Sequence, residues 1–336
     1  MTRRRPFAAS LAELKDLVLS CLYFSGVLWG LALLRLRQRI VVLTYHRVLP
    51  RERQADSYSA AGILVTPSVF DMQMRFLRRH FTPLSWDEFL RILRERAPVP
   101  RRACLVTFDD GWHDTLEFAL PVLRRHAIPA VLFIAGDFIG TGRCFWQERM
   151  SCLLDALRDR PETARLVGAE PLANRDSIRE FVTRLKAAPM ARVDSLLSSL
   201  ERMSSSDRGC GEDRFLDWNG VSELVASRLV TIGSHAMSHR PLTRIPPSEA
   251  SRELRDSRHL LRHRTGTEIT ALAYPNGDAT RDVAGIAEAA GFHAAFTTVR
   301  GHVTASSDPF LLSRLNIHEG SARTRGGFLS RMLGLT

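Results

Sequence analysis

The sequence predicts an α/β protein in which short strands alternate with helices. Its 336 residues, 45% apolar and 25% charged, have the length and composition of a globular chain with a sizeable core. After Arg39, short apolar runs bounded by polar residues recur along the chain. Amphipathic stretches lie between most of these runs. That alternation is typical of a parallel sheet with crossover helices, either closed or open.

Seven apolar runs are the predicted strands. They cover residues 40–45, 103–108, 130–134, 230–234, 272–274, 294–298 and 311–317. Thr66, followed by a proline, predicts a helix start, because threonine can cap a helix and proline suits its first turn. Ser85 and Glu88 have the spacing of a capping box, which predicts a second start. Further helical patterns cover residues 247–264 and 281–290.

The alternation of predicted strands and helices stops between residues 145 and 214. This segment has no convincing strand, but it has several helical stretches, including 177–186 and 193–203. We therefore expect a helical insertion carried by one domain at residues 40–320, and not an independent domain. Residues 321–336 are expected to form a C-terminal tail.

The N-terminal region, residues 1–39, contains the longest uncharged stretch of the chain, at 17–34, with basic residues on both sides. Its length is at the short end of what spans a bilayer, and no A-x-A-like cleavage site follows it. Three interpretations stay open: a helix that spans or lies on a membrane, a helix packed on the protein itself, and a signal-like segment. We expect membrane association through 17–34. The flanking charges leave the side of the membrane open.

The charge of the chain is strongly positive, with 47 Lys and Arg against 36 Asp and Glu, a net charge of +11. The basic residues are spread along the chain, so we interpret most of them as solvated surface. The sequence contains no helix-turn-helix, zinc-finger or aromatic RNP pattern. We therefore expect no nucleic-acid partner, and the oligomeric state stays open.

Two adjacent carboxylates, Asp109 and Asp110, follow the predicted strand at 103–108 and precede a glycine. The carboxyl ends of parallel strands form the active-site face of α/β barrels. Adjacent side chains diverge at a strand end, so one acid can bind a metal ion while its neighbour takes a proton. The alternative is a plain strand-to-turn junction, because Asp-Gly is a common turn pair.

Two histidines, His235 and His239, follow the predicted strand at 230–234. Histidines four residues apart can contact one metal ion on a helical turn or a bent loop; otherwise they are surface residues of a turn. With one acid they would complete a two-histidine, one-carboxylate set for a divalent ion. Such an ion would polarise a carbonyl group and lower the pKa of bound water, and the second acid would act as the base.

These segments resemble two motifs of the polysaccharide deacetylase family, carbohydrate esterase family 4. TFDDG at 107–111 is similar to the first motif. HAMSH at 235–239 is similar to the second, H-[ST]-x-x-H, with Ala236 in place of the usual hydroxyl residue. The resemblance covers roughly residues 40–318 and implies a distorted (β/α) barrel of about seven strands.

The resemblance also implies roles. Asp109 takes the position of the base, and Asp110, His235 and His239 take the positions of the metal ligands. The implied cofactor is one divalent ion, with zinc preferred over cobalt or nickel.

Residues 273–277, AYPNG, are similar to a weaker variant of the third family motif, R-x-P-Y-G. The resemblance implies that the backbone N–H of Asn276 helps to hold the oxyanion. It also places Tyr274 among the substrate-binding residues. Ala273 stands where the family has the arginine that orients the base, and Arg314 is a candidate substitute. Without the resemblance, the segment is an ordinary Pro-Asn-Gly turn.

Two histidines are candidates for the general acid. LNIH at 315–318 is similar to the late family motif L-x-I-H, in which the histidine, here His318, protonates the leaving amine. LTYHR at 43–47 resembles the opening strand of membrane-linked and exopolysaccharide branches of the family, which implies the same role for His46. Trp218 is similar to a pocket tryptophan of the family, although core packing explains it equally well.

The implied function is metal-dependent removal of the N-acetyl group from an amino sugar in a polysaccharide, an oligosaccharide or a lipid-linked glycan. The partner would be an N-acetylated glycan, at a bacterial-type cell envelope. Two alternatives stay open: a deformylase or other amide hydrolase on a lipid-linked sugar, and a glycan-binding pseudoenzyme.

Overall fold

Seven parallel strands close into a barrel in the computed structural model, which describes residues 11–168, 172–204 and 214–336. The order around the barrel is β1-β10-β9-β8-β7-β6-β5, and β5 pairs with β1 to close it. The bounds are β1 (Val41–Tyr45), β5 (Ala103–Phe108), β6 (Ala130–Ile134), β7 (Val230–Ser234), β8 (Ala271–Ala273), β9 (Ala294–Arg300) and β10 (Leu312–Asn316). Each predicted strand is confirmed. The short β4 (Thr82–Pro83), which we did not predict, pairs with the start of β5.

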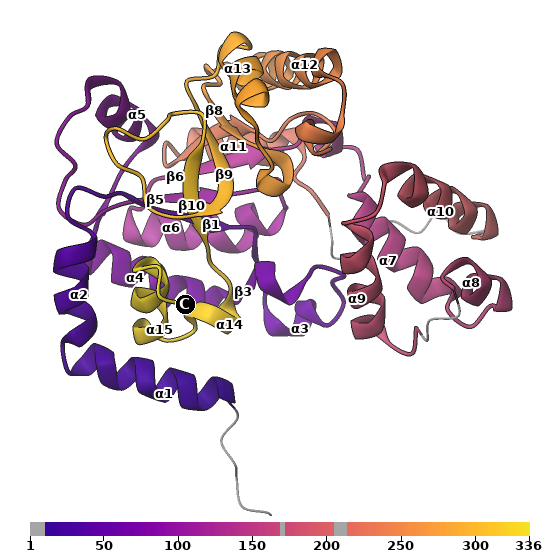
Figure 1. Ribbon diagram of the computed structural model, residues 1–336, viewed down its shortest axis with the longest axis horizontal. Helices are drawn as coiled ribbons and strands as arrows, with labels where there is room; N and C mark the ends of the chain where they lie inside the picture. The colour runs from indigo at the N-terminus through magenta and orange to yellow at the C-terminus, as the bar shows by residue number, and fades with distance from the viewer. Residues whose placement is uncertain (1–10, 169–171, 205–213) are drawn as a thin grey trace, which may run out of the picture.

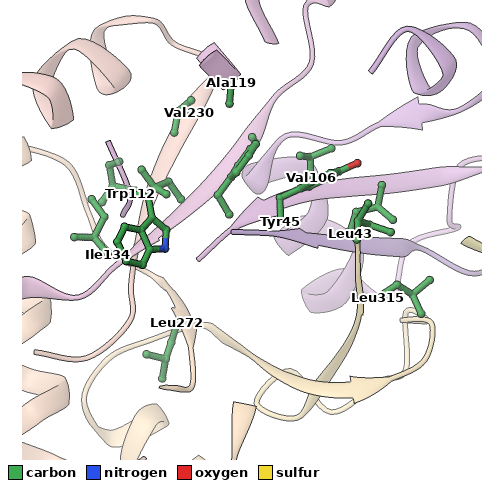
Figure 2. Packing of buried hydrophobic residues seen from close by; sticks show 14 of the residues in the cluster. Leu43, Tyr45, Val106, Trp112, Ala119, Ile134, Val230, Leu272 and Leu315 are labelled. Carbon is green, nitrogen blue, oxygen red and sulfur yellow. The ribbon is translucent and has the colours of Figure 1, made fainter. Parts of the chain in front are cut away.

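Both faces of the barrel strands are buried, which explains why the strands are continuous apolar runs. One set of side chains meets inside the barrel: the rings of Phe133 on β6 and Phe296 on β9 lie 5.6 Å apart although these strands are not neighbours. The other set, including Leu43, Val106 and Leu315, packs outward beneath the surrounding helices (Figure 2).

Helices surround the barrel (Figure 1). Their bounds are α4 (Pro67–His80), α5 (Trp86–Glu95), α6 (Leu120–His126), α11 (Trp218–Ala226), α12 (Pro247–Thr265) and α13 (Arg281–Ala289). The capping box is confirmed, because Ser85 accepts from the Glu88 amide and Glu88 accepts from the Ser85 amide. Thr66 is the residue before α4, but its side chain makes no cap hydrogen bond. Short elements follow β1: β2 (Arg47–Val48), α3 (Arg51–Gln54) and β3 (Leu64–Val65).

Of the helices that the structure describes between β6 and β7, four form a separate group beside the barrel (Figure 1). They are α7 (Trp146–Leu157), α8 (Pro161–Leu166), α9 (Arg175–Leu185) and α10 (Met190–Met203). Their apolar faces pack on one another around Leu154, Ile178 and Leu200, apart from the barrel core. Residues 169–171 and 205–213 of the expected insertion lie outside the described residues.

The two ends of the chain pack together. The uncharged stretch at 17–34 is not one helix, because Gly26, with φ 83°, separates α1 (Leu11–Phe24) from α2 (Val27–Arg35) at a bend of 76°. Among the described helices, none alone has the length and apolar content to cross a bilayer; the bent pair reaches that threshold only together. The residues expected to form a tail, 321–336, instead include the end of α14 (Glu319–Ala322) and all of α15 (Arg325–Met332), which packs against α1 (Figure 1).

Candidate metal centre

Asp110, His235 and His239 come together at the carboxyl ends of β5 and β7. Asp110 is the second residue after β5 and has a left-handed backbone, with φ 77°, which turns its carboxylate toward β7. His235 directly follows β7. Left-handed conformations at Ala236 and His239 curl the following loop, so the two imidazole rings lie only 5.0 Å apart. The two histidines, four residues apart, are therefore brought together by a bent loop and not by a helical turn.

The distances fit a single small cation. Asp110 Oδ1 lies 3.5 Å from His235 Nε2 and 3.4 Å from His239 Nε2. Two donors that each lie about 2.1 Å from a tetrahedral ion are about 3.4 Å apart. All three donor atoms lie within 4.8 Å of one another. Two imidazoles and one carboxylate are also the donor types of catalytic zinc sites with an open position.

Each of these three side chains is held by a further contact. His235 Nδ1 lies 2.7 Å from the carbonyl of Ala273, which can only accept, so the ring donates there and Nε2 keeps its lone pair for a cation. Trp112 Nε1 donates to Asp110 Oδ2 at 2.8 Å, which leaves Oδ1 facing the histidines. Phe145 stacks on the ring of His239 at 3.9 Å and 7°.

The histidine loop is also fixed from α12. Glu253 accepts from the amides of Met237 and Ser238, both at 2.9 Å, and from the Ser238 hydroxyl. Ser234 Oγ accepts from the Ala236 amide at 3.1 Å. These contacts hold the loop although Ala236 lacks the hydroxyl of the family motif.

Charge and burial set the protonation of the ligands. Burial raises the pKa of Asp110, but the hydrogen bond from His235 and the neighbouring histidines outweigh it and hold the pKa below its usual range. Burial lowers the pKa of His239 to about 3. Burial lowers the pKa of His235 too, but the hydrogen bond with Asp110 and the two carboxylates raise it overall. An ionised carboxylate and a neutral His239 are the forms that bind a cation.

Asp109 is held by Arg314, the arginine considered as a substitute for the missing motif residue. Arg314 Nη1 and Nη2 each donate to one oxygen of Asp109 at 2.7 Å, and both side chains are buried. Burial raises the pKa of Asp109, but the attraction of Arg314 outweighs it and lowers the pKa below its usual value. The carboxylate is therefore ionised and oriented beside Asp110.

The two candidate general acids lie in different places. His46 Nε2 is 3.9 Å from Asp109 Oδ2, and His46 lines the cavity of about 130 Å³ that contains Asp109, Asp110 and the two histidine ligands. His318 precedes α14 and is not among the residues that line this cavity. The geometry therefore favours His46, although our sequence analysis named His318 as well.

The third motif forms a turn at the cavity, at the end of β8. Asn276 has a left-handed backbone, with φ 58°, and lines the cavity. Tyr274 also borders the cavity, but its ring is fully buried and its hydroxyl donates to the carbonyl of Phe310. Trp218 does not line this cavity: it begins α11, beneath the guanidinium of Arg264. Of the two interpretations of Trp218, the geometry favours packing.

Sequence reasoning missed several supporting residues. Trp112, two positions after Asp110, is the tryptophan that lines the cavity. Arg47 lies 4.3 Å above its ring and pairs with the buried Asp114 at 2.7 Å. The position of Trp112 close after the acidic pair could have indicated that it belongs to the site. No local pattern in the sequence indicates that Arg47 packs on Trp112.

Comparisons with known proteins agree with this geometry. The family model for polysaccharide deacetylase matches residues 96–295. The chain belongs to the polysaccharide deacetylase family. This family is metal-dependent, and the Asp-His-His cluster is a possible metal site.

Two curated relatives illustrate the range of similarity. "Putative polysaccharide deacetylase YxkH" of Bacillus subtilis is 19% identical over 296 residues, which cover 88% of this chain and 77% of that protein. Poly-beta-1,6-N-acetyl-D-glucosamine N-deacetylase of Staphylococcus epidermidis is 29% identical over 109 residues, which cover 30% of this chain and only 37% of that protein.

Solved structures share the fold. Streptococcus pyogenes deacetylase PplD, in complex with acetate, matches with a TM-score of 0.58 and 19% identity over 88% of this chain and 98% of that chain. IcaB from Ammonifex degensii matches with a TM-score of 0.57 and 19% identity over 89% and 98%.

Proposed function

We propose that this protein is a metal-dependent deacetylase that hydrolyses the N-acetyl group of an amino sugar within a glycan. The supporting observation is that one cavity contains three candidate ligands, with Asp110 Oδ1 3.5 and 3.4 Å from the two histidines, and an ionised carboxylate that is not one of the three. An amide is unreactive toward water, so its hydrolysis needs an activated nucleophile, a stabilised oxyanion and a proton for the leaving nitrogen. The cavity contains a candidate group for each task.

Asp109 would accept a proton from the attacking water. Its lowered pKa keeps it ionised at neutral pH, and the two hydrogen bonds from Arg314 fix the orientation of its oxygens. The backbone N–H of Asn276 would donate to the oxygen of the scissile carbonyl as negative charge develops there. The turn at Pro275–Gly277 fixes this N–H before the substrate binds.

His46 would donate a proton to the departing amine. It borders the same cavity as Asp109, and its buried Nδ1 has no hydrogen-bond partner among the residues that the structure describes, so none of these residues fixes its tautomer through Nδ1. His318 lies outside the lining of the cavity, and its backbone carbonyl accepts from the amides of Ser321 and Ala322 in α14.

Asp110, His235 and His239 would hold the metal ion, and zinc suits two imidazoles and one carboxylate at tetrahedral spacing. When bound, the ion supplies a Lewis acid that polarises the carbonyl and lowers the pKa of water. The ligands contribute by their orientation, which contacts with the Ala273 carbonyl, Trp112 and Phe145 hold.

The first substrate to test is poly-β-1,6-N-acetylglucosamine, because the staphylococcal relatives that match part of this chain are named for its deacetylation. The helices α7 and α9 border the cavity through Gln147 and Arg179, so they are placed to contact sugars beyond the reacting one. Chitin-type oligomers and lipid-linked N-acetylated sugars complete the panel.

The test is acetate release from this panel by zinc-loaded protein, with mass spectrometry of the glycan. The wild type should release acetate. Asp109→Asn should reduce turnover by about 10²–10⁴-fold. Asp282→Asn, an identical change at an exposed residue of α13, should leave turnover unchanged. Equal acetate release by wild type and Asp109→Asn would contradict the mechanism.

Two other results would replace the proposed deacetylase activity with a different function. Formate release from an N-formylated sugar without acetate release would identify a deformylase. Tight glycan binding with neither product, by protein shown to contain one metal ion per chain, would identify a glycan-binding protein.

A further inference from the structure

Large apolar side chains are exposed on α1 and α2 far more than elsewhere. Among the described residues, eight of the eleven exposed large hydrophobic residues lie between residues 11 and 34: Leu11, Leu14, Leu17, Val18, Phe24, Val27, Leu33 and Leu34. The exposure is substantial, 88% for Leu11, 80% for Phe24 and 77% for Leu34. A soluble monomer rarely exposes so many apolar residues together, and such a patch marks an interaction surface. We call these eight residues the N-terminal apolar patch.

The opposite face of the helix pair is fixed to the protein. Leu19 packs so closely on α15 that a side chain at Gly326 would overlap its carbonyl. Arg323 pairs with Asp16, and Arg35 donates to the Leu333 carbonyl at 3.2 Å. Leu28 and Ala32 on α2 are buried in the main core.

These contacts distinguish an interfacial helix pair from a spanning one. A spanning segment needs about 20 apolar residues in one helix and is surrounded by lipid. Here the bend at Gly26 divides the pair at 76°, and one face is already occupied by protein. The free apolar face can therefore enter only the outer part of a bilayer, as amphipathic helices do. Tyr23 and Trp29 belong to the occupied face, where their rings pack on Phe76 of α4.

Positive charge surrounds the N-terminal apolar patch. Lys15, Arg35, Arg37 and Arg39 are exposed on or directly after the two helices. Beside α2, a groove is lined by Leu33 and Leu36 together with Arg37, Arg101 and Arg102. Glu13 and Asp16 are the acidic residues of this stretch, and Asp16 is paired with Arg323.

We propose that α1 and α2 bind peripherally to the surface of an anionic lipid bilayer, with the N-terminal apolar patch among the acyl chains and the surrounding arginines at the head groups. The positive charge around the patch favours a bilayer over a second copy of the chain as the binding partner. A second copy of the chain would bring an identical cationic rim against this one, which like-charge repulsion disfavours. An anionic bilayer supplies both an apolar interior and the complementary charge. This binding needs neither the metal ion nor catalysis.

Vesicle co-sedimentation of the full-length protein tests the proposal. The protein should bind phosphatidylglycerol-containing vesicles and bind pure phosphatidylcholine vesicles much more weakly. The triple variant Leu17→Gln, Phe24→Gln, Leu34→Gln should weaken binding at least tenfold. The matched control Leu166→Gln, Val299→Gln, Leu335→Gln changes the three exposed hydrophobic residues outside the patch and should bind as the wild type does. Arg37→Gln with Arg39→Gln should weaken binding about fivefold per arginine.

Several outcomes would overturn the proposal. One is no binding of the wild type to anionic vesicles, and another is an equal loss in the control triple. A concentration-dependent dimer, seen by light scattering and abolished only in the patch triple, would identify a second copy as the occupant. Resistance to extraction from cell membranes by high salt and alkaline buffer would indicate a spanning segment. Acetate release from a soluble substrate, measured in parallel, should be equal in all variants, so a failed deacetylase assay leaves this test unaffected.

Discussion

At the scale of single residues, the ion pair of Asp109 and Arg314 affects both the stability of the fold and the orientation of the proposed base. Both groups are buried, and each carboxylate oxygen accepts one hydrogen bond at 2.7 Å. Arg314→Met would leave a buried carboxylate without its partner, and removing one partner of a buried pair costs about 3–5 kcal/mol of stability. We therefore expect a loss of that size in chemical denaturation, together with a large loss of turnover.

A second substitution separates the charge effect from a packing effect. Asp109→Asn in the Arg314→Met background removes the orphaned charge, so the double variant should recover part of the lost stability without recovering turnover. If the double variant were less stable than the wild type by the sum of the two single costs, the loss would come from packing.

Trp112 would act on the proposed metal ion through Asp110. Its indole N–H holds Asp110 Oδ2 and so directs Oδ1 toward the histidines. Trp112→Phe keeps an aromatic side chain and removes this donor, so we expect metal affinity to fall by about 10–100-fold, as for other partners of metal ligands. Titration with zinc against a competing chelator measures this. Trp218→Phe should leave both metal affinity and KM unchanged, and a raised KM for that variant would restore Trp218 to the substrate site.

At the scale of elements, the sequence-based predictions held where a pattern is local. Buried parallel strands are apolar throughout, so all seven barrel strands were visible in the sequence, and so was the Ser85 capping box. The site residues that directly follow β5 and β7 were visible for the same reason, since a strand end fixes their position. The break at Gly26 was missed because an uncharged stretch of helical length does not reveal a bend that packing against α15 stabilises.

The turn at the end of β8 depends on its glycine. Gly277 has φ 75°, and a side chain there would overlap the backbone nitrogen and the side chain of Thr298 on β9. Gly277→Ala must therefore displace the turn that carries Asn276, and we expect loss of turnover as well as stability. Gly142→Ala is the matched control: Gly142 has φ 67° with open space around it, so this change measures left-handed backbone strain alone, about 1–2 kcal/mol. Equal effects of the two changes on turnover would show that the turn tolerates the displacement.

At the scale of the whole molecule, the cavity joins parts of the chain that no local pattern connects. Gln147 on α7 and Arg179 on α9 border the same space as Asp109 and Asn276 from the barrel. Motifs revealed the reacting groups because these residues lie next to strands. The contribution of the four-helix segment depends on how it packs beside the barrel, which is a tertiary property. Substrate specificity therefore belongs to the part of the site that the sequence could not specify.

The metal ion should also contribute to the stability of the whole fold, because its ligands come from two strands, β5 and β7, that are separated in the barrel by β6. An ion that binds only the native state stabilises it by about 2.7 kcal/mol at a free concentration 100 times its Kd. Calorimetry of the zinc-loaded wild type should therefore show a Tm several degrees above that of protein stripped by a chelator, and added zinc should restore it. His239→Ala should melt at one temperature with or without zinc, whereas His263→Ala, which removes a histidine from α12 outside the metal cluster, should keep the zinc-dependent shift. A zinc-dependent shift that survives in His239→Ala would place the stabilising ion elsewhere in the protein.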